Sequence, residues 1–142
     1  MTEKDIQSIR DFNRFYTNII GLLDNHILDS PYSLPEARVL YELFHRQPCA
    51  ASDIMTSINM DKGYLSRVLK SFEKKGLLTR KPSKEDGRVA TLVLTFKGER
   101  EFEKINQASA AQIEGLLSGM NQQDIKAAIQ HMEQLKKLFG NI

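Results

Sequence analysis

Residues 60–99 have the sequence MDKGYLSRVLKSFEKKGLLTRKPSKEDGRVATLVLTFKGE, and this stretch decides the fold. Its first part predicts an amphipathic helix, because apolar residues recur at three- and four-residue spacing and so share one face. These residues are Leu65, Val68, Leu69 and Phe72. Asp61 can cap the free N–H groups of the first turn, and Gly76 can end the helix in a left-handed conformation.

After Gly76 the spacing of apolar residues changes to two, which predicts a pair of antiparallel strands. The alternating residues are Leu78 before the turn and Ala90, Leu92 and Leu94 after it. The connection at residues 82–88, PSKEDGR, is rich in turn formers. Asp86 and Gly87 are the pair expected to take positive φ at the tip of a protruding hairpin.

Positive charge is concentrated on this helix and hairpin. Residues 62–88 contain nine basic and three acidic residues, a net charge of +6, whereas the whole chain has +2 and the rest therefore about −4. A localised basic element is typical of nucleic-acid binding proteins. The alternative is a solvated helix face, but only Glu73 is available there as an acidic partner. A basic helix fits the major groove, and a hairpin tipped with arginine fits the minor groove beside it.

Several short motifs in this stretch resemble the MarR (multiple antibiotic resistance regulator) family. They are the helix start D-K-x-x-x-S-R from Asp61, E-K-K-G-L from Glu73, D-G-R from Asp86 and L-T-x-x-G from Leu94. The resemblance extends along nearly the whole chain. It implies an α+β, mainly α, winged helix-turn-helix protein that binds double-stranded DNA at an inverted repeat and regulates transcription, most commonly as a repressor.

The resemblance and the charge together select the candidate DNA-binding residues. The helix would supply Lys62, Gly63, Ser66, Arg67 and Lys70, and the hairpin would supply Lys84, Asp86 and Arg88. Arg67 is the candidate for a base contact, because its planar guanidinium can bond guanine O6 and N7 together.

The rest of the chain is expected to be helical, with the winged helix-turn-helix at residues 33–95 and dimerisation helices at 1–30 and 96–142. Residues 4–28 predict one long helix with a broad apolar face. Ser33 and Glu36 form a capping-box pattern before a second helix, and residues 50–58 predict a short third one. Thr95 and Asn121 are N-cap candidates for the last two helices, which also carry apolar stripes. Packing of the terminal helices between two subunits is the favoured interpretation; an intrachain three-helix bundle is the alternative.

Composition and motifs indicate no catalytic site, no metal site and no cofactor. The three histidines are not at metal-ligand spacing, and Cys49 is the only cysteine, so a chain has no intrachain disulfide. Cys49 is expected to be a small packed residue, with a redox-sensing thiol as the alternative. No apolar run is long enough to span a bilayer, and the N-terminus lacks a secretion signal, so the expected location is the cytoplasm.

Two further questions concern a candidate effector site and the alternatives to a DNA-binding regulator. The family resemblance implies a small-molecule effector between the terminal helices and the winged helix-turn-helix, with Phe12, Tyr16 and His45 as candidate contacts. Plain core packing is the alternative. Residues 12–43 also resemble the regulator half of MarR-type proteins fused to a GNAT acetyltransferase. A third reading is an interaction module that dimerises without binding DNA.

Overall fold

The computed structural model describes residues 1–20, 30–84, 86–87 and 89–140. The described residues form, in chain order, α1 (Glu3–Ile19), α2 (Leu34–Arg46), α3 (Ala51–Ile58), α4 (Lys62–Lys74), β1 (Leu78–Pro82), β2 (Ala90–Leu94), α5 (Phe96–Leu117) and α6 (Gln122–Phe139). Two compact units are present, residues 1–107 and 108–142. The mainly helical fold with one small antiparallel sheet confirms the predicted fold class.

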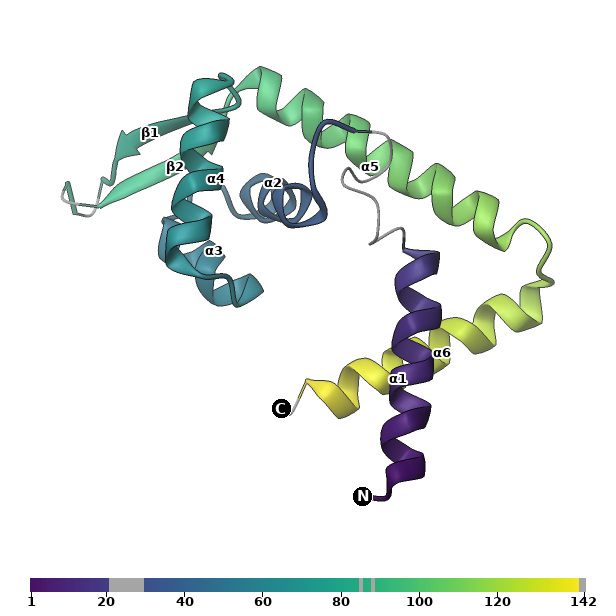
Figure 1. Ribbon diagram of the computed structural model, residues 1–142. Helices are drawn as coiled ribbons and strands as arrows, with labels where there is room; N and C mark the ends of the chain where they lie inside the picture. Colours follow the sequence, from purple (N-terminus) through teal and green to yellow (C-terminus); the bar gives the residue numbers. More distant parts are fainter. Residues whose placement is uncertain (21–29, 85, 88, 141–142) are drawn as a thin grey trace. The chain divides into compact units, whose positions relative to one another are not determined.

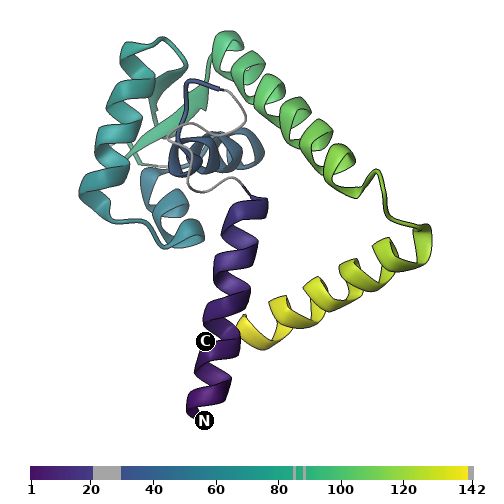
Figure 2. The same ribbon diagram turned by 45° about the vertical axis from the view of Figure 1, so that its right-hand side comes forward.

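Helices α2, α3 and α4 gather around the β1–β2 hairpin, which extends away from them (Figures 1 and 2). The strands pair antiparallel, with Leu78 opposite Leu94 and Pro82 opposite Ala90. Cys49 adds a short backbone bridge to the other side of β2, since its N–H donates to the Leu92 carbonyl and its carbonyl accepts from the Leu92 N–H. The sheet is thereby attached to the segment between α2 and α3. We call residues 30–105 of this assembly the winged module.

The core of the winged module is formed by side chains from every one of its helices and from both strands. The fully buried side chains are Val39, Leu40 and Leu43 of α2, Ile54 of α3, Phe72 of α4, and Leu77 and Leu92 around the hairpin. The predicted apolar face of α4 points into this core, because Leu65, Val68 and Leu69 are also buried. The opposite face of α4 is left at the surface.

The predicted helix caps are confirmed. The Ser33 hydroxyl accepts from the Glu36 N–H while the Glu36 carboxylate accepts from the Ser33 N–H, and Asp61 accepts from the Tyr64 N–H. Gly76 has a φ of +72°, and the Leu77 N–H reaches back to the Phe72 carbonyl to end α4. Local side-chain to backbone hydrogen bonds therefore fix where these helices begin and end.

Two expectations from the sequence are wrong. The first helix was predicted to continue to residue 28, but α1 ends at Ile19, where Thr17, Asn18, Ile19 and Ile20 all have low helix propensity. The rest of that prediction, residues 21–28, lies outside the described residues.

The second correction concerns the hairpin tip, where Gly87 does not have the predicted positive φ. The Ser83 N–H donates to the Val89 carbonyl, and the Val89 N–H donates to the Asp86 carbonyl. The connection is thus longer than a two-residue hairpin loop, and a longer loop can reverse the chain without a left-handed residue pair.

Helices α1 and α6 contain no buried residue, although both carry apolar stripes. Exposed side chains on α1 include Ile9, Phe12 and Phe15, and those on α6 include Ile129, Met132 and Phe139. In α5 the early residues Phe102 and Ile105 are buried, whereas Ile113 and Leu116 are exposed. Large apolar surfaces therefore remain uncovered in a single chain.

Candidate nucleic-acid interface

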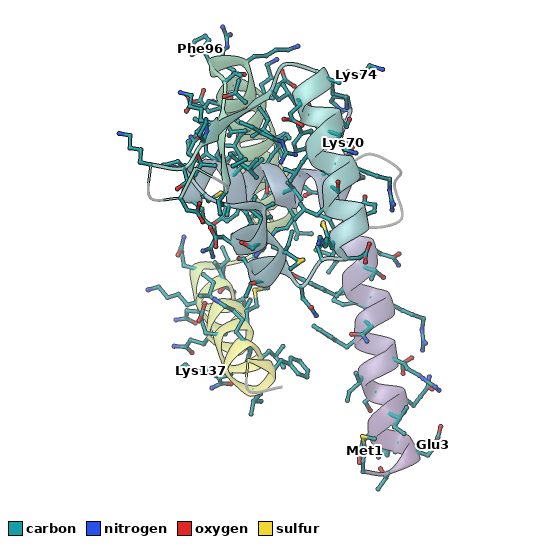
Figure 3. All side chains as sticks on the ribbon, turned by 90° about the vertical axis from the view of Figure 1, so that its left-hand side faces the viewer. Met1, Glu3, Lys70, Lys74, Phe96 and Lys137 are labelled. Carbon is teal, nitrogen blue, oxygen red and sulfur yellow. The ribbon has the colours of Figure 1, made fainter. Side chains whose placement is uncertain are left out.

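The outer face of α4 presents the residues predicted to contact DNA. Lys62, Gly63, Arg67 and Lys70 are exposed, and Ser66 is partly buried. Lys70 extends outward from the middle of the helix in Figure 3. A Cβ on Gly63 would lie 3.2 Å from Asp61 Oδ1 and 3.7 Å from Arg67 Nη1, so a side chain there would crowd the cap and the arginine.

The cations of this face have no acidic partners within the described residues: Lys62, Arg67 and Lys70 form no ion pair there. The expected internal partner, Glu73, is occupied, because its Oε1 lies 2.7 Å from Nε of Arg80 on β1. The Arg67 guanidinium lies 5.6 Å from the centre of the Tyr64 ring. Unneutralised like charges on one helix face are unfavourable unless an anion binds there.

Tyr64 was not among the residues selected from the sequence. A cation over an aromatic ring is attracted by the ring quadrupole, so Tyr64 restricts the direction of the Arg67 side chain. The sequence could have indicated this contact, because Tyr64 and Arg67 are three residues apart and so lie on one side of a helix.

Two of the three DNA-binding residues predicted on the hairpin belong to the described residues. Lys84 and Asp86 are exposed at its tip, and Arg88 lies outside the described residues. The Asp86 N–H donates to the Ser83 hydroxyl, which helps to close the loop. The structure thus places Lys84 and Asp86 on the element that projects beside α4.

The turn between α3 and α4 has the geometry of a helix-turn-helix motif. Asn59 ends α3 in the left-handed region with φ of 48°, a conformation that asparagine tolerates better than most residues. Asp61 then caps α4 at once. The predicted tight turn at residues 59–61 therefore sets the angle between the two helices.

Glu42, a buried carboxylate on α2, holds α3 in place. It accepts hydrogen bonds from Arg46 Nε at 2.6 Å and Ser57 Oγ at 2.8 Å, and Arg38 lies 3.1 Å from its other oxygen. Burial favours a raised pKa for Glu42, but these hydrogen bonds and the charges of Arg38 and Arg46 outweigh burial and lower the pKa. Sequence reasoning missed this network, because the serine belongs to another helix.

Tyr32 braces the back of α4. Its ring packs edge-on against Phe72, with centres 6.1 Å apart, and its hydroxyl donates to Glu101 of α5. Burial first, and then the Glu101 carboxylate, raise the pKa of Tyr32 to about 12, so this hydroxyl keeps its proton near neutral pH. The segment before α2 thereby joins α4 to α5.

Comparison with known proteins shows which family this arrangement resembles. The MarR family model matches residues 32–90, which include α2, α3, α4 and β1. The curated regulator MhqR of Bacillus subtilis is 27% identical over 135 residues, covering 95% of this chain and 93% of that protein. Residues 32–90 therefore match the MarR family, and the chain is similar to MhqR over nearly its whole length.

Other MarR-type proteins match over different lengths. YdgJ of Bacillus subtilis, an uncharacterised HTH-type transcriptional regulator, is 24% identical over 100 residues, which span 70% of this chain and 61% of that protein. The structure of Streptococcus pneumoniae FabT in complex with DNA superposes with a TM-score of 0.80 at 20% identity, covering 96% of this chain and 98% of FabT. The predicted winged helix-turn-helix fold is therefore confirmed, and the curated proteins that the chain resembles are transcriptional regulators.

The three effector candidates of this chain fall into two groups. The Phe12 and Tyr16 rings stack on α1 with centres 5.7 Å apart. His45 instead lies among the rings of Tyr41, Phe44 and Phe102. No ring contact joins the two groups within the described residues, so the shared pocket stays a prediction.

Cys49 is buried, and burial raises the pKa of its thiol, as expected for a packed residue. The part of the chain that the structure describes contains no group of three histidine, cysteine, aspartate or glutamate residues arranged to hold a metal ion. Among these same residues, no helix combines the length and the apolar character that crossing a membrane requires.

Proposed function

We propose that the protein is a homodimeric repressor that occupies a promoter by binding an inverted repeat in double-stranded DNA. The observation that carries this proposal is that Lys62, Arg67 and Lys70 of α4 form no ion pair within the described residues, while Glu73 on the same helix is engaged by Arg80. Phosphates would neutralise these cations and release counterions. FabT, which has a similar fold, has been observed in complex with DNA, and this supports the proposal.

We assign different roles to α4 and to the hairpin. Arg67 would bond a guanine edge in the major groove, while Lys62 and Lys70 would contact phosphates, and Gly63 and Ser66 would allow close approach. Arg88 would enter the minor groove next to the major groove that α4 occupies, and Lys84 and Asp86 would support the hairpin tip. Two α4 helices in a two-fold dimer would then read half-sites whose centres lie roughly 10 bp apart, or a multiple of that distance.

The dimer is proposed from the uncovered apolar surfaces of the terminal helices. The winged helix-turn-helix at residues 33–95 buries its own core, whereas α1 and α6 contain no fully buried residue. We therefore assign residues 1–30 and 96–142 to dimerisation. A second copy would remove these apolar surfaces from water, which provides a large favourable free energy of association.

A small-molecule effector is proposed to relieve repression. Phe12 and Tyr16 offer a stacked aromatic pair, and His45 adds a polar group to a second aromatic cluster. A ligand that binds better to the state with incorrectly spaced α4 helices would weaken DNA binding by its differential affinity, typically about 1–3 kcal/mol.

We propose that the protein is not an enzyme and that it acts in the cytoplasm. Its matched relatives are transcriptional regulators, which disfavours the acetyltransferase fusion. The interaction module without DNA binding is disfavoured because Lys62, Arg67 and Lys70 of α4 form no ion pair within the described residues and would attract an anion.

The experiment that tests the proposal begins with genome-wide capture of bound DNA to define an operator. Affinity for operator and for scrambled duplex is then measured across a salt series. Arg67→Ala should cost about 1–3 kcal/mol per half-site and relax sequence preference. Arg88→Ala should weaken binding to both duplexes more equally and flatten the salt dependence.

Lys126→Ala is the matched control, because Lys126 is an exposed cation on α6, outside the winged module. It should leave affinity unchanged. If Arg67→Ala and Arg88→Ala both retain the wild-type affinity and salt slope, the assignment of α4 and the hairpin to the grooves is wrong.

A further inference from the structure

A second basic surface lies where α5 begins, and it includes an exposed aromatic side chain. Phe96, the first residue of α5, is 75% exposed. Figure 3 shows it at the same end of the winged module as Lys74, the last residue of α4. We call this surface the Phe96 patch, and its residues are Lys74, Lys75, Phe96, Lys97 and Arg100.

Direct contacts hold the Phe96 patch together. Lys97 Nζ donates to the Lys75 carbonyl at 2.8 Å, and the Thr95 hydroxyl donates to the Gly76 carbonyl at 2.7 Å. The Arg100 guanidinium lies 5.8 Å from the centre of the Phe96 ring. These contacts fix the start of α5 against the end of α4, so the patch is a preformed surface.

The positive charge of the patch is not neutralised within the described residues, where its four basic side chains form no ion pair. Neighbouring acids have hydrogen-bonded partners outside the patch, and Glu101 also interacts electrostatically with Lys97. Glu73 pairs with Arg80, Glu99 accepts from the Gln47 amide, and Glu101 pairs with Lys104. The exposed phenyl ring therefore lies beside Arg100 on a surface of net positive charge, and we call the four basic residues of the patch its cationic rim.

We infer that the Phe96 patch binds an acidic protein segment that carries a large apolar side chain. Burying Phe96 against an apolar side chain gains hydrophobic free energy, while the cationic rim attracts acidic residues and repels basic ones. Aromatic residues and arginine are also the residues most often found as energetic centres of protein interfaces.

DNA fits this patch less well than the α4 face does. The twelve-residue rise from Lys62 to Lys74 corresponds to roughly 18 Å along the helix, whereas the major groove is about 8.5 Å deep. When the start of α4 enters the groove, the patch stands away from the groove floor. An exposed phenyl ring also gains little from phosphate oxygens. The inferred partner is thus a protein, and the regulator would contact it in addition to DNA.

The test measures binding of the protein to a fluorescein-labelled peptide in which leucines alternate with aspartates. Binding is measured by fluorescence anisotropy at low salt. A peptide with alanine in place of each leucine measures simple charge attraction. The variants are Phe96→Ala and the double variant Lys97→Glu with Arg100→Glu, and Arg67→Ala is the matched control outside the patch. Thermal unfolding, operator affinity and sedimentation are recorded for each.

The wild type and Arg67→Ala should each bind the leucine peptide at least about tenfold more tightly than they bind the alanine peptide. Both patch variants should lose that preference. Operator affinity and subunit mass of Phe96→Ala should equal those of the wild type. Equal binding of the two peptides would overturn the inference, as would an unchanged preference in Phe96→Ala. Loss of operator affinity would instead assign the patch to DNA, and dissociation of a dimer would assign it to a second copy.

Discussion

At Gly98 the helix α5 lies directly against the backbone of Leu77. A Cβ added at Gly98 would be 2.1 Å from the Leu77 carbonyl oxygen and 3.1 Å from Leu94 Cδ2. Because the obstacle is backbone, Gly98→Ala should shift α5 or the hairpin and lower the free energy of unfolding by about 1–3 kcal/mol. Urea denaturation followed by circular dichroism measures this change.

Gly115→Ala is the matched control in the same helix, since nothing lies within 4 Å of its added Cβ. Replacing an unhindered helical glycine with alanine should raise stability by about 0.5–1 kcal/mol. A Gly98→Ala protein as stable as the wild type would show that the close approach of α5 to Leu77 is absent in solution.

Glu42 is the residue whose charge should link stability to pH. Its pKa is lowered in the folded state, so the ionised carboxylate contributes stability that is fully present above the ordinary value of 4.5. That contribution is lost as pH falls below 4.5 and through the lower pKa of the folded protein. Glu42→Gln should lower the free energy of unfolding by about 1–3 kcal/mol at neutral pH, with a smaller difference in acid.

Denaturation of the wild type and Glu42→Gln at several pH values tests this prediction. Glu103→Gln provides the control, because Glu103 is exposed and forms no ion pair within the described residues. A difference between the wild type and Glu42→Gln that stays constant from neutral pH into acid would contradict the role given to the charge.

At the scale of elements, Thr95 connects three pieces of structure. Its hydroxyl accepts from the Gly98 N–H at 3.1 Å, which caps α5, and donates to the Gly76 carbonyl at the end of α4. Its own N–H donates to the Leu77 carbonyl. Thr95→Ala should therefore lower the free energy of unfolding by about 1–2 kcal/mol.

Thr95→Ser keeps the hydroxyl and should restore most of that stability. Chemical denaturation of both variants separates the hydrogen bonds from the packing of the methyl group. If Thr95→Ser is as unstable as Thr95→Ala, the methyl group rather than the cap stabilises this junction.

For the whole molecule, the uncovered stripe of α6 predicts a dimer. Ile129 is 54% exposed in the middle of that stripe. Burying a large apolar side chain contributes roughly 1.5–3 kcal/mol, and a buried unpaired carboxylate is strongly unfavourable. Ile129→Asp should therefore dissociate the proposed dimer or unfold it, as measured by sedimentation equilibrium and circular dichroism.

Gln130→Asp is the control, since Gln130 is exposed and lies outside the apolar stripe of α6. It adds the same charge and should keep the mass of the wild type. A wild-type protein that sediments as a stable folded monomer at micromolar concentration would exclude the dimer.

The sequence by itself determined the features that depend on neighbouring residues. The caps at Ser33, Asp61 and Asn121 and the left-handed Gly76 were predicted correctly, because each involves hydrogen bonds or backbone angles within a few residues. The apolar period also gave the buried face of α4, and charge selected its outer face.

Tertiary structure alone decided which groups meet across the chain. The pairing of Glu73 with Arg80, the bridge between Cys49 and Leu92, and the approach of Gly98 to Leu77 all join separate elements. Their distances depend on how the helices and the hairpin pack, and spacing along one element carries no information about that packing. This packing also directs Glu73 toward Arg80 of β1, which leaves Lys62, Arg67 and Lys70 of α4 without an ion pair among the described residues; the proposed DNA contact rests on this arrangement.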